Sequence, residues 1–372
     1  MGGLKIFHCA DLHLGLRFSS YPSEISERLR EARFLSLEKM VARANREGCR
    51  LFVVAGDLFD TLKVAQRDVA RAAKILSGFE GTAAVLPGNH DFHAGAADDF
   101  WKHFTAGEKG NVLLLEKPGV YPLAEIDTVL YASPCHSKHS PSHALGWLEG
   151  AKRPEANFHI GIAHGSFEGL SPDLQGDYFP MKAADLVRHK FIDLWLLGHI
   201  HVPHPLKPGS ADRIFYSGTH EPDGFDCRHE GRAWLLGLGA DKGIRAESLS
   251  TGAFRFREEE LSIRNLQDLA AFSARFSPEE GARTLLKFSL AGSLAREEYE
   301  RLGAELESLK ARFFHLRADF SALALELAPA DIEREFTSGS FPHRLLSELL
   351  EDREALQLAY QLLSESGQGR DA

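Results

Sequence analysis

The stretch LKIFHCADLH, residues 4–13, indicates the fold of the chain because an apolar run leads directly into two side chains that can bind a metal ion. Residues 4–9 form a short, nearly continuous apolar run, which is typical of a strand buried on both faces of an α/β sheet. Asp11 and His13 follow it closely. Open α/β sheets bind their ligands at this end of a strand, so the stretch predicts a sheet with chemistry at its carboxyl edge.

The same arrangement occurs four more times along the chain. Each time, a short apolar run bounded by glycine or proline precedes an Asp, Asn or His, as expected for strands followed by functional loops. The runs and the side chains after them are residues 51–55 with Asp57, 82–86 with Asn89, 158–163 with His164, and 194–197 with His199 and His201. We therefore expect each of these polar side chains just past the carboxyl end of a strand.

Together these side chains offer carboxylate, amide and imidazole ligands but no thiolate, a mixture that hard or borderline divalent metals bind. Two divalent ions about 3.5–4 Å apart require an anionic group that touches both, and Asp57 is the candidate because it lies between the other motifs. The expected ligands are Asp11, His13 and His201 for one ion, and Asn89, His164 and His199 for the other. The flanking Gly56, Gly88 and Gly198 are expected to permit close backbone approach or a positive φ.

His90 follows Asn89 directly and is expected to point the other way, toward a substrate. With Asp91 beside it to hold its ring, His90 could stabilise charge or protonate a leaving oxygen. A water acidified by the two ions would be the nucleophile. These residues predict the hydrolysis of a phosphate ester.

The motifs resemble those of the calcineurin-like metallophosphoesterase superfamily and, within it, the SbcD-type DNA repair nucleases with their YhaO-like bacterial branch. The resemblance covers residues 1–257 and rests on CADLHLG (9–15), VVAGDLFD (53–60), LPGNHD (86–91), IAHGSFEG (162–169) and LLGHIH (196–201). It implies a four-layer α/β/β/α sandwich, the same seven metal ligands and a substrate-facing His90. It also implies manganese as the usual ion, while iron, zinc and magnesium stay open because such sites overlap in ligand preference.

One position departs from the family pattern. Several repair nucleases carry a His three residues after the bridging Asp, where it is thought to help position the DNA phosphate, and this chain has Asp60 there. Some bacterial members also have Asp at this position, so the family is not excluded. An exonuclease mechanism that depends on an imidazole at this position would not find one in this chain.

The resemblance also implies partners, namely DNA and a coiled-coil ATPase of the SbcC or YhaN kind. Related nucleases form homodimers through helices, for which the helices expected at residues 25–46 and 69–76 are candidates. The formal net charge of −10 counts against strong binding of nucleic acid by this chain alone. Bound ions and a basic partner subunit could supply the missing positive charge.

Composition predicts a globular protein of the cytoplasm. The chain has 372 residues, of which 44% are hydrophobic and 26% charged, as in ordinary soluble domains. No apolar run approaches the roughly 20 residues of a membrane helix, and no signal-peptide pattern is present. The widely spaced Cys9, Cys49, Cys135 and Cys227 indicate buried or free thiols of a reducing compartment.

Three regions are expected: a metallophosphoesterase domain at residues 1–257, a small α+β capping domain at 258–332, and a linker with an amphipathic helical tail at 333–372. In the first region, a second sheet is expected to contain residues 112–115, 128–132, 213–216 and 233–238. In the capping domain, the pattern predicts a strand at 285–290, a helix at 296–310, and one or two strands within 313–327.

Two further questions stay open from the sequence. The basic residues of the capping domain either contact phosphates or form a solvated surface paired with the interspersed Glu residues. The apolar stripe of the tail, between residues 345 and 363, either docks on the ATPase coiled coil or packs on its own domain.

The leading hypothesis is a manganese-dependent phosphodiesterase that acts on DNA as the nuclease subunit of a repair complex. A phosphatase or a small-molecule phosphodiesterase, such as one for cyclic nucleotides, is the first alternative, although a cap and a partner-binding tail would serve it little. A non-catalytic scaffold that keeps metal for structure is the second alternative, and the full ligand set argues against it.

Overall fold

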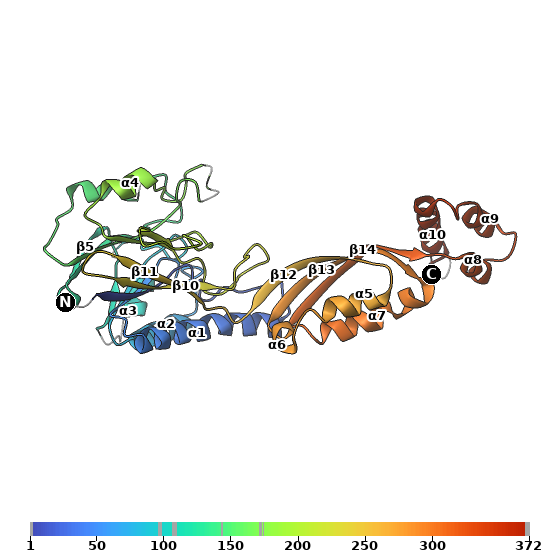
Figure 1. Cartoon of the computed structure of the whole chain (residues 1–372), viewed down its shortest axis with the longest axis horizontal. Helices are drawn as coiled ribbons and strands as arrows, with labels where there is room; N and C mark the ends of the chain where they lie inside the picture. Colours follow the sequence, from blue (N-terminus) through green and yellow to red (C-terminus); the bar gives the residue numbers. More distant parts are fainter. Residues whose placement is uncertain are drawn as a thin grey trace. The chain divides into compact units, whose positions relative to one another are not determined.

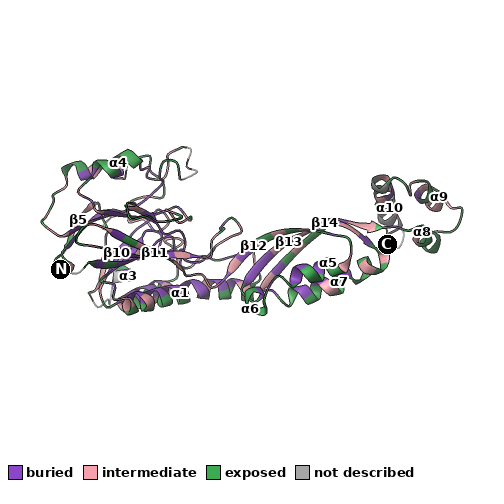
Figure 2. Ribbon diagram, in the orientation of Figure 1, coloured by how far each residue is buried: buried purple, intermediate pink, exposed green. Residues whose placement is uncertain are grey.

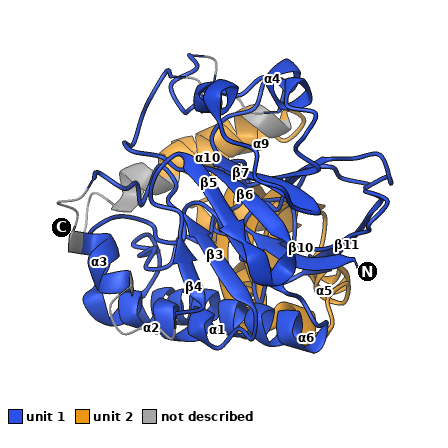
Figure 3. Cartoon of the chain, turned by 90° about the vertical axis from the view of Figure 1, so that its left-hand side faces the viewer, with its two compact units in different colours: residues 1–255 blue, residues 256–372 orange. Residues whose placement is uncertain are grey.

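The computed structural model describes residues 3–95, 99–105, 110–142, 144–170, 173 and 175–368. The chain divides into two compact units, Met1–Arg255 and Phe256–Ala372, which Figure 3 colours separately. Within the described residues, no helix combines the length and the apolar character needed to cross a bilayer. All four cysteines are buried and free, as predicted.

The first unit contains two sheets and the helices that cover them. Its elements are β1 (Leu4–Cys9), α1 (Ser23–Arg46), β2 (Leu51–Ala55), α2 (Gln66–Ser77), β3 (Thr82–Leu86), α3 (Asp99–Thr105), β4 (Val112–Leu114), β5 (Gly119–Leu123), η1 (Ala124–Ile126), β6 (Thr128–Ser133), η2 (Gly146–Gly150), β7 (Phe158–His164), α4 (Ala183–Arg188), β8 (Leu194–Gly198), β9 (Ile214–Tyr216), β10 (Arg232–Leu238) and β11 (Ile244–Ser250).

The first sheet has the strand order β11-β10-β1-β2-β3-β4, in which β1 to β4 are parallel and β10 and β11 are antiparallel additions. Its central strands are buried on both faces, as their continuous apolar sequence predicts (Figure 2). Because side chains alternate, Phe52 and Val54 pack under α1, α2 and α3, while Val53 and Ala55 face the second sheet.

The second sheet has the order β5-β6-β7-β8-β9 and is parallel except for the β5–β6 pair. Its inner face shares one core with the first sheet, and its outer face is covered by Leu145, Leu148 of η2 and Leu186 of α4. The three larger helices lie on one side of the paired sheets and α4 on the other (Figure 1). The predicted α/β fold with a four-layer α/β/β/α sandwich is therefore confirmed.

Two strands lie in a different sheet from the one expected. Residues 112–114 (β4) pair with β3, and β10 pairs with β1, so both belong to the first sheet. Only β6 and β9 of the four segments expected in the second sheet lie there. A short apolar run shows that a strand forms, but its partner is set by long-range contacts that local patterning does not encode.

The second unit begins with a three-stranded sheet of order β12-β13-β14. Its elements are β12 (Arg255–Ile263), α5 (Leu266–Ser273), α6 (Pro278–Gly281), β13 (Thr284–Ala295), α7 (Arg296–Lys310), β14 (His315–Glu326), α8 (Pro329–Glu335), α9 (Phe341–Glu348) and α10 (Arg353–Gln368). Residues of α5 and α7, including Leu269 and Leu306, pack with Phe288 in one core. The predicted strand–helix–strand order of this region is the one observed.

The last three helices, α8 to α10, share a small apolar core of their own. Ile332, Leu346 and Leu356 meet there with Leu327 at the end of β14. The apolar stripe of the tail thus packs at least partly within its own unit. The limit expected between residues 332 and 333 falls inside α8, and these contacts lead us to propose a limit before Pro329 instead.

Candidate metal centre

All seven side chains expected to bind metal come together where five strands of the two sheets end. Asp11 and His13 follow β1, Asp57 follows β2 and Asn89 follows β3 in the first sheet. From the second sheet, His199 and His201 follow β8, whereas His164 is itself the last residue of β7. The centre therefore lies at the carboxyl edge common to both sheets.

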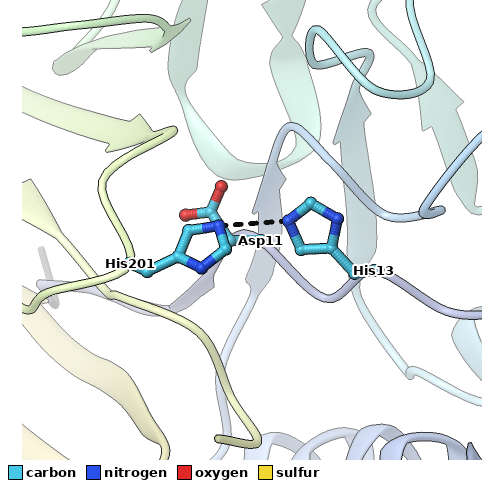
Figure 4. Close-up of side chains that lie close together, drawn as sticks. All are labelled: Asp11, His13 and His201. Carbon is cyan, nitrogen blue, oxygen red and sulfur yellow. Dashed lines mark hydrogen bonds between the residues drawn. The ribbon is translucent and has the colours of Figure 1, made fainter. Parts of the chain in front are cut away.

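Asp11, His13 and His201 form the first group (Figure 4). The Nε2 atoms of His13 and His201 lie only 3.1 Å apart and face each other. Asp11 is fully buried, and its carboxylate accepts hydrogen bonds from the backbone N–H of His199. Two imidazole nitrogens that face each other beside a buried carboxylate fit a cation between them.

Asn89, His164 and His199 form the second group. The Oδ1 atom of Asn89 lies 3.0 Å from both His164 Nε2 and His199 Nδ1. Asp57 lies between the two groups, because its Oδ2 atom is 3.3 Å from His164 Nε2 and 3.7 Å from His13 Nε2. This is the placement that a carboxylate shared by two ions requires.

Four of the seven side chains are carried by backbone in the left-handed region. The φ angles are 55° at Asp11, 42° at His13, 53° at Asp57 and 101° at His199. Such angles cost free energy in residues other than glycine and are concentrated at functional sites. Backbone hydrogen bonds from Asp11 N to Gly56 O and from His13 N to Asp57 O hold the loops after β1 and β2 together.

The flanking glycines lie so close to metal-binding side chains that a Cβ atom at either position would overlap with one of them. A Cβ atom on Gly88 would lie 2.2 Å from Asp57 Oδ1, and one on Gly56 would lie 2.0 Å from His164 Nδ1. Of these two glycines, only Gly56 also needs a positive φ, at 94°. The close approach expected at these glycines is therefore present.

The charges of the centre favour a bound cation. Burial disfavours the charged form of His164, but Asp57 and Asp11 outweigh this effect and raise its pKa to about 9. Burial likewise opposes a charged His201, and Asp223 with Asp11 raises its pKa to about 9. Burial acts against ionised Asp57 too, yet His164 and His13 hold its pKa below the ordinary value. At the other two imidazoles burial dominates and lowers the pKa of His13 and His199, which keeps them in the neutral form that binds a metal.

His90 and Asp91 lie beside the centre, but Asp91 does not hold the His90 ring as predicted. The Asp91 carboxylate accepts hydrogen bonds from the backbone N–H groups of Gly88 and Phe59 instead. The His90 ring uses Nδ1 to contact the carbonyl oxygen of Asp60 at 3.0 Å, and its backbone N–H donates to Asp57 Oδ1. Asp91 is fully buried. Its carboxylate connects two loops, because Gly88 belongs to the loop after β3 and Phe59 to the loop after β2.

The sequence patterns did not identify three polar residues of the centre, Asp223, Asp60 and Arg33, which lie behind the metal-binding side chains. Asp223 Oδ2 lies 3.0 Å from His201 Nδ1, and Asp60 Oδ1 lies 3.6 Å from His13 Nδ1. The fully buried guanidinium of Arg33 on α1 donates to Leu12 O, Glu221 O and Thr219 Oγ1. Only Asp60 had a sequence signal, because it departs from the pattern of the nucleases that the chain resembles.

Comparisons with known proteins indicate the family of the chain. The sequence model of the family described as Calcineurin-like phosphoesterase matches residues 4–203. The uncharacterized metallophosphoesterase YhaO of Bacillus subtilis is 29% identical over 210 residues, which are 53% of this chain and 48% of that protein. The DNA double-strand break repair protein Mre11 of Aeropyrum pernix is 37% identical over 92 residues, which are 23% of this chain and 21% of that protein. The chain thus spans at most about half the length of these relatives.

A crystal structure of a Thermus thermophilus protein aligns with 67% of this chain and 99% of its own, at 14% identity and a TM-score of 0.42.

Proposed function

This chain belongs to the calcineurin-like phosphoesterase family, and from that premise we propose that it is a two-metal phosphodiesterase that cleaves DNA as part of a repair complex. The observation that carries the proposal is the position of Asp57, whose one carboxylate oxygen approaches a histidine of each ligand group. The family is one of metal-dependent phosphoester hydrolases, and the described residues offer a matching ligand set.

In this proposal the seven side chains divide as the two groups suggest. Asp11, His13 and His201 would hold one ion, Asn89, His164 and His199 the other, and Asp57 both. Bound divalent ions would acidify a water as nucleophile and neutralise charge on the phosphate. Manganese is the proposed ion, and the same ligand types also suit iron, zinc or magnesium.

His90 has a defined part in the same proposal. Its Nδ1 atom faces the Asp60 carbonyl oxygen, which accepts a hydrogen bond only if Nδ1 carries the proton. Nε2 is then the nitrogen left to meet a substrate oxygen. In the charged imidazolium form, Nε2–H can stabilise the phosphate or protonate the leaving oxygen.

DNA as the substrate rests on the Mre11 match and on the motif resemblance, not on charge. In the second unit, Arg275, Lys287 and Arg296 form ion pairs with acidic neighbours. Their positive charge is therefore already partly neutralised within the chain. We therefore propose that DNA contact depends on the first unit and on a basic partner, in line with the acidic net charge.

The partner we propose is an SbcC- or YhaN-like coiled-coil ATPase, bound at the tail. A groove of about 880 Å³ lies between the end of β14 and α10 and is lined by Leu325, Leu350, Leu356 and Leu358, among other residues. Leu358 is 59% exposed, whereas Leu356 in the same groove is buried. An apolar groove of this kind suits the apolar face of a helix.

The test compares DNA with a generic diester. End-labelled duplex and single-stranded DNA, and bis-(p-nitrophenyl) phosphate, are incubated with Mn²⁺ and either the wild type or His90→Asn. We expect wild-type cleavage of DNA and a fall of about 10²–10⁴-fold in the variant, with both ions retained. Diester turnover without DNA cleavage, even with the ATPase added, would favour a small-molecule phosphodiesterase. No turnover of any phosphoester would favour a scaffold.

A further inference from the structure

The two ligand groups differ in what stands behind their imidazoles. In the first group, both rings have a carboxylate at the nitrogen that faces away from the centre. Asp223 Oδ2 lies 3.0 Å from His201 Nδ1, and Asp60 Oδ1 lies 3.6 Å from His13 Nδ1. Both carboxylates are at least three-quarters buried, and the charge of buried Arg33 acts on both.

In the second group, the nitrogen of His164 that faces away from the centre meets a neutral group. His164 Nδ1 contacts the backbone carbonyl oxygen of Ala55 at 2.9 Å. His199 directs Nδ1 to Asn89, and its ring lies against the ring of Tyr178. The charge of Asp173 also acts on His199, while its oxygens accept hydrogen bonds from the backbone N–H groups of Gly176, Asp177 and Tyr178. The outward nitrogen of His164 therefore has a backbone carbonyl oxygen where the two rings of the first group have carboxylates.

The ligands themselves differ in the same sense. The first group contains the Asp11 carboxylate, whereas the second contains the neutral amide of Asn89. Asp57 is common to both, and the Asp11 carboxylate also lies within 4.8 Å of the ligand atoms of Asp57 and His164. A carboxylate behind a ligating His fixes the ring and makes its free nitrogen a stronger donor to a metal. Loss of such a partner typically weakens metal affinity about 10–100-fold.

We propose that Asp223 and Asp60 are positioning residues that make the Asp11–His13–His201 position the tighter one, which fills first, and leave the Asn89–His164–His199 position to exchange its ion. The proposal rests on the two-ion centre proposed above. It also assigns a role to Asp60, which is to orient the His13 ring. Several repair nucleases carry an imidazole at this position, where this chain has a carboxylate.

Calorimetric titration of the metal-free 372-residue chain with MnCl2 tests the proposal. We expect two binding steps in the wild type that differ at least about tenfold in Kd. Asp223→Asn should weaken the tighter step about 10–100-fold and leave the weaker step unchanged. Asp60→Asn should act in the same direction but less, because its oxygen is farther from the ring.

Two further variants assign the steps to positions and control for folding. Asn89→Ala should remove the weaker step and keep the tighter one. Asp193→Asn is the matched control, because Asp193 is also a largely buried carboxylate, bonded to Lys242 Nζ and His159 N at the amino end of β8. It should change neither step. Circular dichroism of each metal-free variant shows whether it has folded.

Electron paramagnetic resonance of the wild type supplies a readout that needs no variant. One equivalent of Mn²⁺ should give the spectrum of isolated ions, and a second equivalent should give a coupled pair. A coupled spectrum at one equivalent, two equal Kd values, or loss of only the weaker step in Asp223→Asn would overturn the proposal. If the wild type bound no Mn²⁺, the proposed two-ion centre itself would fail, which is a different result.

Discussion

Polar residues serve opposite purposes in the two units of this chain. In the first unit, Asp11, Asp57 and His164 are almost completely buried and converge on one centre, at the cost of left-handed backbone at two of them. In the second unit, Lys287 and Glu258 are exposed and satisfy each other. Burial, and not residue type, separates the two cases, because an unpaired buried charge must be offset by a neighbour or an ion.

Exposed apolar side chains occur in both units, and in the second unit they include residues of α10. The first unit hides its strands between helices and a second sheet. In the second unit, Leu358 and Leu362 on α10 are 59% and 58% exposed. We therefore expect single atoms to decide activity in the first unit, and apolar surface to decide association in the second.

The largest effect should come from a methyl group in the first unit. Gly88→Ala would place Cβ 2.2 Å from Asp57 Oδ1, so the shared carboxylate must move. We expect Mn²⁺ affinity to fall at both positions and diester turnover to fall about 10²-fold or more, since displacements of about 1 Å have such effects. Gly146→Ala, where the new methyl meets nothing within 4 Å, is the control. Equal turnover of the two variants would show that Asp57 is not held as tightly as the contacts indicate.

The second effect is the dependence of metal binding on pH. The pKa values of His164 and His201 are raised from 6.5 to about 9, so their protons stabilise the metal-free fold fully below about pH 6.5 and this stability is lost as the pH rises through about 9. An ion must displace these protons. The Kd for Mn²⁺ should therefore fall as the pH rises from about 7 to about 8, by about tenfold for each proton displaced. A Kd that does not change over this interval would contradict the raised pKa values.

The third effect belongs to the second unit. Leu358→Glu should weaken binding of an SbcC- or YhaN-like ATPase about tenfold or more, because a charge enters the apolar groove. Turnover of bis-(p-nitrophenyl) phosphate should not change. Phe341→Glu is the matched control, since Phe341 is 72% exposed but does not line the groove. Pull-down of the ATPase with each variant measures the difference, and equal loss in both would remove the groove from the proposal.

The smallest effect should come from the exposed ion pairs of the second unit. Lys287→Ala removes the partner of Glu258, and both side chains are nearly half exposed. Such pairs contribute about 0–1 kcal/mol, so thermal unfolding should shift little. DNA cleavage should also remain within about twofold of the wild type. A large fall in DNA cleavage alone would show that Lys287 contacts phosphate after all, and would weaken the contrast between the units.

Sequence patterns located the site better than the sheets around it. The strands before Asp11, Asp57, Asn89 and His164 were predicted because apolar runs between turn residues are a local signal. The partner of β10 could not be predicted, since its apolar run fits either sheet and only long-range pairing with β1 decides. The role expected for Asp91 failed for a related reason. Adjacency in the sequence suggested a contact with His90, but backbone donors of Gly88 and Phe59 lie nearer to its carboxylate.

Local sequence was sufficient to indicate the family, the order of strands and loops, and the residue types of the metal centre, because these depend on apolar periodicity and on motifs with fixed spacing. Which atoms face each other depends on the folded chain. Folding placed Asp223 behind His201 and Asp60 behind His13, put four ligand residues into left-handed backbone, and paired basic residues of the second unit with acids. Such contacts join residues far apart in the chain, and they exist only once packing has brought the strands and loops together.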